Sequence, residues 1–381
     1  MSLEARNLTS GTISLAFSNG AEAIIQGPAR FQPISSTQLQ VTSGKVVISC
    51  PTPESRGFEL ILPGIQITDL GTEFGVIAGA DNAELHVFEG SVAVRRQAAS
   101  QSNPTIYRQQ QACRLDYSNG PPHPILVDDS AFIRPIDFRL LGTRGPWAEY
   151  AQTLRRDRTL VLWSDMTPGP AGQLINAAPV LNNGTRIISP KTALQTQAGR
   201  HRGATALQIL DAKHAVQMQI PGSFQNLTLA AWVKFFPEPR NARDHRGILM
   251  SDGWGLPGQI HWQRKSRDFR LTFPRIDATD HARYVAETKQ LDDQQWHLLV
   301  TVIDGQHQRR VVQYLDGRAL SNESLNIPFR SMQLGNCTLG GWQPPAGNRE
   351  NRSLNGLIDE LFVWNRALDA SEVESLYRVS R

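Results

Sequence analysis

The stretch that decides the fold is Asn355-Gly-Leu-Ile-Asp-Glu-Leu-Phe-Val-Trp-Asn-Arg-Ala-Leu-Asp-Ala-Ser-Glu-Val-Glu-Ser-Leu-Tyr377. Its first half predicts a β-strand with two apolar faces, because alternate side chains of a strand point to opposite sides. One face carries Leu357, Leu361 and Val363, and the other carries Ile358, Phe362 and Trp364. A strand that is apolar on both faces is typical of the middle of a buried sheet. We therefore expect a central position for it.

Asp359 interrupts this apolar strand. By parity its carboxylate lies on the Leu357 face, where an ionised group is costly unless a cation or several donors compensate for it. After the strand, Asp369 and Glu372 form the capping-box pattern of a short helix that runs through Leu376.

This whole stretch resembles the closing strand and terminal helix of LamG-like domains, whose pattern is Gly, then Ile-Asp-Glu/Asp, then Asn-Arg-Ala-Leu and an acidic helix start. Earlier segments fit the same family: Thr159–Ser164, Leu227–Lys234, Trp296–Val302 and the Asp316-Gly317 turn. The Asp-Gly pair is a strong hairpin signal. The resemblance implies a concanavalin A-like antiparallel jelly-roll sandwich over residues 159–381.

The N-terminal part reads as a second all-β domain. Short Val, Ile and Leu runs from residue 11 to 116 are broken by Gly, Pro, Asn and Ser, without a long helical period. Leu39–Ile48 and Leu85–Val94 repeat each other with an offset of 46 residues (85 minus 39). Each copy fits a hairpin turning at Gly44 or Gly90, which pairs Val41 with Val46. The same spacing also fits a corner of a stacked β-solenoid.

A Leu-Gly-Thr-x-Phe-x-Val pattern, Leu70–Val76, lies between the two copies. Together with the Val-x-Glu-Gly-x-Val pattern at Val87–Val92, it resembles the FecR-type domain, the periplasmic sensory region of membrane-anchored sigma-factor regulators. The resemblance implies a FecR-like β-solenoid or β-sandwich domain over residues 1–127, with structural roles for Gly71, Thr72 and Phe74. It also implies that the native chain is anchored in the inner membrane upstream of Met1, and that only this upstream segment contacts a sigma factor.

A helical connector is expected over residues 128–158. Asp128-Asp129-Ser130 can cap the segment after it, and Pro146–Asp157 predicts a helix. Its apolar stripe consists of Trp147, Tyr150, Ala151 and Leu154, and we expect this stripe to pack on a β domain.

Composition indicates a soluble globular chain. The 381 residues are 40% hydrophobic and 19% charged, and 39 Lys and Arg against 35 Asp and Glu give a net charge of +4. This small excess is spread along the chain, which argues against nucleic-acid binding. Three cysteines, Cys50, Cys113 and Cys337, indicate buried or free thiols, with a Cys50–Cys113 bridge in an oxidising compartment as the alternative.

Enzyme motifs are missing from the sequence, including His-Glu-x-x-His, Gly-x-Ser-x-Gly and a phosphate-binding glycine loop. Glycosidases on concanavalin-like sandwiches use Glu-x-Asp-x-x-Glu along one strand, because acid and nucleophile must flank one bond about 5 Å apart. Asp292-Asp293 and Asp359-Glu360 are adjacent instead, and in a strand such neighbours point to opposite faces. We expect no catalytic residues.

Asp359 is also a candidate calcium ligand. Related sandwiches often hold one structural calcium ion beside this last strand, and by analogy Asn182, Asn183 or Asp165 contributes further oxygen ligands. The alternative is a carboxylate satisfied by N–H groups of a neighbouring loop.

A sugar site would combine aromatic rings with polar groups that fix hydroxyls. The candidate ligand-binding residues are Trp254, His261, Trp262, Arg264 and Trp342, with Arg267 beside them. For each tryptophan, packing beneath a loop is the alternative.

These observations predict a non-catalytic sensory or binding protein in the periplasm or at the cell surface, whose ligand is a carbohydrate or a cell-surface protein. The alternatives are a glycoside-active enzyme of the concanavalin-like superfamily and a structural adhesion protein.

Overall fold

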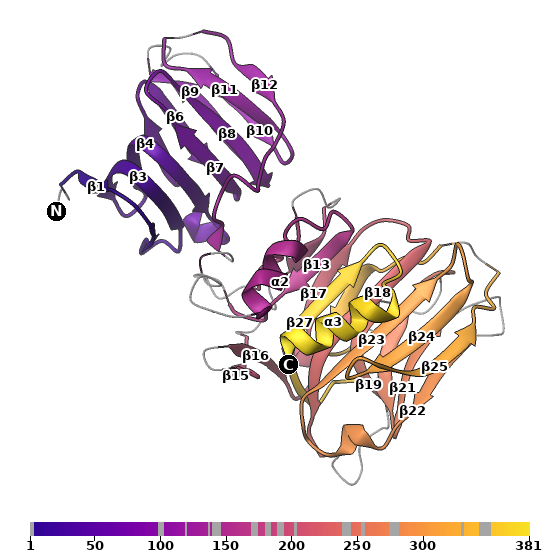
Figure 1. Cartoon of the computed structure of the whole chain (residues 1–381). Coiled ribbons are helices and arrows are strands. Elements are labelled where there is room, and N and C mark those ends of the chain that lie inside the picture. The colour runs from indigo at the N-terminus through magenta and orange to yellow at the C-terminus, as the bar shows by residue number, and fades with distance from the viewer. Residues whose placement is uncertain are drawn as a thin grey trace. The chain divides into compact units, whose positions relative to one another are not determined.

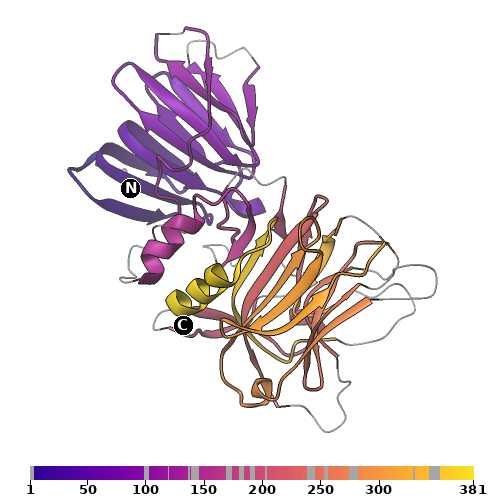
Figure 2. The same ribbon diagram turned by 45° about the vertical axis from the view of Figure 1, so that its right-hand side comes forward.

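Strands form most of the regular structure in the computed structural model, which describes residues 4–97, 103–118, 120–135, 138, 146–168, 174–179, 184–188, 194–201, 204–237, 245–252, 256–273, 282–328, 331–342 and 352–381. The described residues up to 148 form one compact unit, and those from Glu149 onward form a second (Figures 1 and 2). Within these residues, no helix has the length and apolar character needed to cross a membrane.

The first unit is a twelve-stranded sheet that folds on itself around one core. Its path runs β10-β9-β6-β5-β4-β7-β8-β11-β12, while β3 pairs with β4 and both β1 and β2 pair with β3. The elements are β1 (Arg6–Leu8), β2 (Thr12–Ala16), β3 (Glu22–Ser35), β4 (Gln38–Ser49), η1 (Pro53–Ser55), β5 (Glu59–Leu62), β6 (Ile65–Asp69), β7 (Glu73–Ala78), β8 (Asn82–Glu89), β9 (Ser91–Arg96), β10 (Thr105–Arg108), β11 (Ala112–Asp116) and β12 (His123–Ile125).

The two sequence repeats form corners, so the hairpin alternative is wrong. β4 continues through Gly44 and pairs with β5 before this glycine and with β7 from it onward. Val46 pairs with Ile25 and Val76 rather than with Val41. At the second copy, β8 pairs with β7 and β11, whereas β9 pairs with β6 and β10. The apolar residues of both copies nevertheless share one core, as their common face predicts.

The FecR-type pattern has the structural roles that the resemblance implies. Phe74 is fully buried in the core. Gly71 has a φ of 101°, a backbone conformation that residues other than glycine rarely adopt. Asp69 stabilises this turn, because its carboxylate accepts the N–H of Gly71 at 2.8 Å. Cys50, Cys113 and Cys337 are buried free thiols, so the Cys50–Cys113 bridge is not formed.

The start of the predicted connector packs on the first unit. Phe132 meets the Phe88 ring edge-on at 5.3 Å, the N–H of Ile133 donates to the Gln26 side chain at 2.8 Å, and Arg134 forms a buried ion pair with Glu73. A Cβ at Gly75 would lie 2.7 Å from the Phe132 ring. The glycine inside β7 therefore makes room for this segment.

The second unit consists of two antiparallel sheets around one core, as predicted for a jelly roll. One sheet has the order β15-β16-β27-β18-β23-β24-β25, with β13 also paired to β27, and the other has the order β14-β17-β26-β19-β20-β21-β22. The strands are β13 (Leu160–Ser164), β14 (Arg186–Ile188), β15 (Thr196–Ala198), β16 (Thr205–Ile209), β17 (Val216–Ile220), β18 (Asn226–Phe235), β19 (His245–Ser251), β20 (His261–Lys265), β21 (Asp268–Phe273), β22 (Ala282–Glu287), β23 (His297–Asp304), β24 (Arg310–Leu315), β25 (Arg318–Ser324), β26 (Gly335–Leu339) and β27 (Gly356–Trp364).

The second unit also contains the short helices η3 (Ala212–His214), η4 (Gln290–Asp292) and α3 (Ala370–Ser380), and α2 (Pro146–Leu154) spans the division between the two units in the sequence. The capping box at Asp369 and Glu372 is present, and α3 continues four residues beyond Leu376. The α2 helix ends at Leu154, three residues before Asp157, and buries Ala151 and Leu154 of the predicted stripe. The Asp316-Gly317 turn joins β24 to β25 with positive φ at both residues, as the hairpin signal predicts.

β27 has the predicted central position. It pairs with β18 along one edge and with β16 and then β13 along the other, and all nine of its residues are buried.

The corner at Gly90 generates the first prediction. Gly90 has a φ of 74°, and a Cβ there would overlap the carbonyl oxygen of Gly71. Gly57 has a similar φ of 80°, but a Cβ there meets nothing within 4 Å. We expect Gly90→Ala to reduce the free energy of unfolding of the first unit by about 3 kcal/mol, against about 1 kcal/mol of backbone strain for Gly57→Ala.

Urea unfolding followed by circular dichroism measures this difference. Equal losses for the two variants would show that backbone strain alone, and not the close approach of Gly71, requires glycine at this corner.

Candidate functional site

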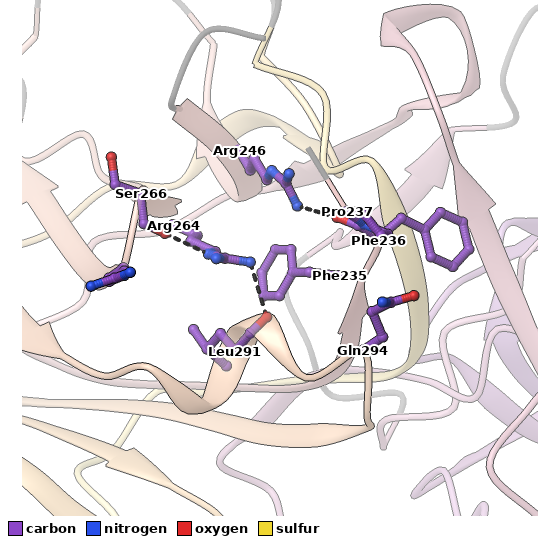
Figure 3. A pocket seen from close by; sticks show the side chains of 9 residues that line it. Phe235, Phe236, Pro237, Arg246, Arg264, Ser266, Leu291 and Gln294 are labelled. Carbon is purple, nitrogen blue, oxygen red and sulfur yellow. Dashed lines mark hydrogen bonds between the residues drawn. The ribbon is translucent and has the colours of Figure 1, made fainter. Parts of the chain in front are cut away.

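A solvent-facing cavity of about 250 Å³ lies at one end of the second sandwich. The end of β18, the start of β19, the turn between β20 and β21, and η4 form its wall (Figure 3). We call it the arginine cavity, and it is lined by Phe235, Phe236, Pro237, Arg246, Arg264, Ser266, Arg267, Leu291 and Gln294.

Arg264 is held firmly in the arginine cavity. Its Nε–H donates to the carbonyl oxygen of Ser266 at 2.8 Å, and Nη1–H donates to that of Leu291 at 3.0 Å. Its Cζ lies 4.9 Å from the centre of the Phe235 ring, a cation–π distance. These contacts fix the orientation of the guanidinium plane. Only 3% of Arg264 is exposed.

Arg246 approaches the same ring from β19. Its Nη1–H donates to the carbonyl oxygen of Phe236 at 2.8 Å, and its Cζ lies 5.8 Å from the Phe235 ring centre. Figure 3 shows both guanidinium groups beside this ring. Arg246 is not among the residues predicted from the sequence, although an arginine beside the apolar run Ile248–Met250 was an available signal.

The rim of the cavity is polar and accessible. Ser266, Arg267 and Gln294 are exposed, and Ser266 and Gln294 have positive φ values of 50° and 60°. The described lining contains three arginines and no acidic side chain. The exposed side chains of Ser266, Arg267 and Gln294 can form hydrogen bonds with polar groups of a ligand.

The structure separates the predicted ligand-binding residues into three places. Arg264 and Arg267 line the arginine cavity, whereas Trp254 lies outside the described residues. Trp262 is in the core between the sheets, where its indole N–H donates to the Thr301 hydroxyl at 2.9 Å. Trp262 therefore packs inside the protein, which is the alternative to a role in ligand binding.

His261 and Trp342 form a separate buried cluster. Their rings meet edge-on at 5.2 Å, and the Cζ of Arg352 lies 4.4 Å from the Trp342 ring centre. A ring nitrogen of His261 lies 3.2 Å from the carbonyl oxygen of Ser251. His261 is fully buried and Trp342 is 4% exposed, so neither ring presents a face to solvent.

Asp359 lies in a buried ion cluster on β27. The backbone N–H of Arg200 donates to Asp359 Oδ2 at 2.6 Å, and the Arg200 Nε lies 3.3 Å from the same oxygen. Arg200 also donates to Glu360 at 2.6 Å and to the carbonyl oxygen of Ser380 in α3. Its Cζ lies 4.0 Å from the ring centre of Trp232. One guanidinium group therefore joins β27, β18 and α3.

Both carboxylates reach Arg200, which corrects the expectation that neighbouring acidic residues point to opposite faces. The reason is a β-bulge: Ala231 pairs with Leu361 and Val233 with Ile358, so Trp232 faces both Asp359 and Glu360. The extra residue also changes the apolar faces, because Ile358, rather than Leu357, joins Leu361 and Val363 in the core.

Calcium binding at Asp359 stays a prediction. Asn182 and Asn183 lie outside the described residues, and Asp165 accepts the N–H of Thr167 at 3.0 Å. A guanidinium group 3.3 Å from Asp359 repels a divalent cation, so the described contacts favour the alternative in which protein groups satisfy this carboxylate. Within the described residues, no three or more His, Cys, Asp or Glu side chains are grouped to hold a metal ion.

Burial controls the ionisation of the ion cluster. Burial raises the pKa of the Glu360 carboxyl to about 8, although the positive charge of Arg200 lowers it, and the charges of Asp359 and Asp165 raise it further. Burial also raises the pKa of Asp359, against the charge and backbone N–H of Arg200. One cation does not compensate for two buried carboxylates.

Two family models match the chain in the order that the sequence predicts. Residues 8–93 match the FecR protein model, and residues 211–374 match the Laminin_G_3 model of the concanavalin A-like lectin/glucanases superfamily. No curated protein matches the chain in sequence.

Solved structures that match this chain include binding domains of botulinum neurotoxins and of a mosquitocidal protein. The botulinum neurotoxin serotype G binding domain is 13% identical with a TM-score of 0.44, over 58% of this chain and 51% of that one. The serotype D ligand binding domain in complex with N-acetylneuraminic acid is 10% identical with a TM-score of 0.45, over 60% and 52%. The binding domain of Paraclostridial Mosquitocidal Protein 1 is 14% identical with a TM-score of 0.44, over 57% and 52%. The match spans about half the length of each of these chains.

The raised pKa of Glu360 predicts a pH dependence of stability. The carboxyl group of Glu360 loses its proton near pH 4.5 in the unfolded chain but only near pH 8 in the folded protein. Between these two pH values the folded protein binds one proton more than the unfolded chain. Its contribution to stability is therefore complete below about pH 4.5 and is lost as pH rises through about 8. We expect Glu360→Gln to flatten the fall in the free energy of unfolding across this range.

Urea unfolding followed by tryptophan fluorescence tests this prediction, because all tryptophans but Trp147 lie in the second unit. Glu374→Gln, at an exposed position of α3, is the matched control and should retain the wild-type slope. Equal slopes for wild type and Glu360→Gln would contradict the proposed ionisation.

Proposed function

Because the chain joins a FecR domain to a concanavalin A-like domain, we propose that it is a non-catalytic binding and sensing protein that acts outside the cytoplasm. The observation that carries the proposal is the arginine cavity, which offers the half-buried ring of Phe236 and the exposed residues Ser266, Arg267 and Gln294 to a ligand. Sites of this composition hold sugars through ring contacts and hydrogen bonds to hydroxyls.

The carboxylates of the second unit support binding rather than hydrolysis. A retaining glycosidase needs two carboxyl groups about 5 Å apart on either side of the substrate. The adjacent pair Asp359 and Glu360 is instead buried, at 2% and 4% exposure, and both side chains contact Arg200. No carboxylate is present in the described lining of the arginine cavity.

We assign the two domains different roles within this function. The concanavalin A-like domain recognises a carbohydrate or a cell-surface protein, and the FecR domain belongs to a membrane-anchored regulator that reports binding to a sigma factor. The FecR model match over residues 8–93 supports this assignment. An adhesion protein of purely structural function is the second candidate, and it requires no occupied cavity.

Binding and turnover assays distinguish these functions. We expect the full chain to be retained by at least one polysaccharide in affinity electrophoresis against plant and algal polysaccharides, with calcium and with chelator. We also expect it to release no reducing sugar, because the described lining of the cavity shows no paired carboxylates.

Two results would contradict the proposal. Turnover that a single Asp or Glu substitution abolishes would identify an enzyme. No retention on any polysaccharide and no binding to a cell-surface protein, in either calcium condition, would favour the structural candidate.

A further inference from the structure

His297, at the start of β23, lies between two carboxylates. Its Nδ1 lies 2.7 Å from Asp316 Oδ2 in the turn between β24 and β25. Its Nε2 lies 3.0 Å from Asp293 Oδ1 in the segment between η4 and β23. Ionised carboxylates only accept hydrogen bonds, whereas a neutral imidazole has a single N–H group to donate. The two contacts together therefore fit the cationic ring, in which both nitrogens carry a proton.

The surroundings of His297 favour this cationic form. Among the described residues, Asp293 and Asp316 are the charged groups that face the ring, and β18 places the uncharged Val233 opposite it. Burial lowers the pKa of His297, but the hydrogen bonds and charges of Asp316 and Asp293 outweigh burial and raise the pKa above its ordinary value of 6.5. The ring is therefore mainly cationic at pH 6.5 and loses one proton at a higher pH.

The oxygen of Asp293 that faces His297 also fixes the backbone at Gln294. Asp293 Oδ1 accepts the N–H of Gln295 at 2.7 Å and so closes a turn around Gln294. Gln294 has a φ of 60°, a conformation that residues other than glycine rarely adopt without such support. Its exposed side chain belongs to the rim of the arginine cavity. One carboxylate oxygen therefore connects the His297 ring with the rim.

Loss of a ring proton breaks this connection on one side only. The contact of His297 with Asp316 is the shorter of the two, so we expect the remaining proton to stay on Nδ1. Asp316 is also held by the N–H of Leu298, which donates to its Oδ1 at 2.9 Å. The lone pair of the neutral Nε2 then faces Asp293 Oδ1, and two acceptors in this position repel each other.

The wall of the cavity before this segment has its own anchor. Leu291 is buried, and its carbonyl oxygen accepts a hydrogen bond from Arg264 at 3.0 Å. We therefore expect the change to be confined to residues 293–295, which include the rim residue Gln294.

We propose that His297 is a positioning residue of the arginine cavity. Its cationic ring holds Asp293, which in turn holds Gln294 at the rim, and loss of one ring proton releases both. Because a fixed side chain binds a ligand with a smaller loss of conformational entropy, ligand binding weakens as pH rises. This effect on binding rests on the proposed carbohydrate-binding function, whereas the positioning of Gln294 does not.

An NMR titration of the isotope-labelled full chain from about pH 5.5 to about pH 9 tests the positioning without a ligand. It records the ring signals of His297 and the amide signals of Gln294 and Gln295. We expect both ring nitrogens to carry protons at the acidic end. The amide signals should then shift with the same midpoint as the ring, above pH 6.5. His297→Gln identifies the ring signals and should abolish the shift of the amide signals.

Asp316→Asn tests the role of the carboxylates while preserving the turn. Asp316 has a φ of 51°, and asparagine tolerates this left-handed conformation as well as aspartate does. The substitution removes one negative charge beside the ring, so the common midpoint should move down by about one pH unit. His307→Gln is the matched control, because His307 is exposed in the loop after β23 and is not among the described lining residues of the cavity. It should leave the midpoint unchanged.

Affinity electrophoresis in gels that contain laminarin or pectin measures the effect on binding. For a polysaccharide that retains the wild type, we expect binding to weaken about threefold to tenfold between about pH 6 and about pH 9, which corresponds to about one hydrogen bond from Gln294. His307→Gln should follow the wild type, whereas His297→Gln should bind equally at both pH values.

The titration and the gels decide separate statements. Amide signals of Gln294 and Gln295 that do not follow the His297 ring would overturn the proposal, and so would an unchanged midpoint in Asp316→Asn. A shared transition with equal retention at both pH values would overturn the effect on binding. If the transition is present but neither polysaccharide is retained, the positioning of Gln294 is supported and the carbohydrate-binding function fails for these ligands.

Discussion

The second unit depends on one arginine that contacts two buried acidic side chains. Asp359 and Glu360 lie in the middle of β27, and moving ionised groups from water into a protein interior costs several kcal/mol each. Arg200 contacts both, stacks on Trp232 and donates to the last turn of α3. Because the carboxyl end of a helix carries partial negative charge, it also favours a cation at this place.

The surrounding backbone is adapted to this ion cluster. A Cβ at Gly199 would lie 2.8 Å from Asp359 Oδ2, so glycine lets the loop approach the carboxylate. The indole N–H of Trp232 donates to the Ser380 hydroxyl, and its ring stacks on Tyr377. The cluster thus connects the centre of the sheet with the terminal helix, and the bulge on β27 is the change in backbone that lets both acids reach one cation.

Sequence patterns predicted those features of the fold that depend on local chemistry. The burial of β27 on both faces, the capping box of α3 and the Asp316-Gly317 turn depend on residues close together in the chain, and all three are present. The predicted division of the faces is wrong, because Ile358 and not Leu357 joins Leu361 and Val363 in the core. The bulge could not be predicted, because Arg200, the cation that both acids reach, lies 159 residues before Asp359. The corner at Gly44 could not be distinguished from a hairpin for a similar reason. A glycine permits both structures, and the pairing of β4 with β3 and β7 determines which of them forms.

The arginine cavity was predictable only in part, and the ion cluster explains why. Arg264 and Arg267 are among the residues predicted from the sequence, whereas Arg246 reaches the cavity because β19 pairs with β20. Sequence shows an arginine but not its partners, and the partners determine its role. Arg200 faces two carboxylates that offset its charge, so it stabilises the fold. Arg246 and Arg264 instead donate to backbone carbonyl oxygens and line a cavity that solvent can enter. The same residue type therefore stabilises the fold at one place and lines a solvent-facing cavity at another.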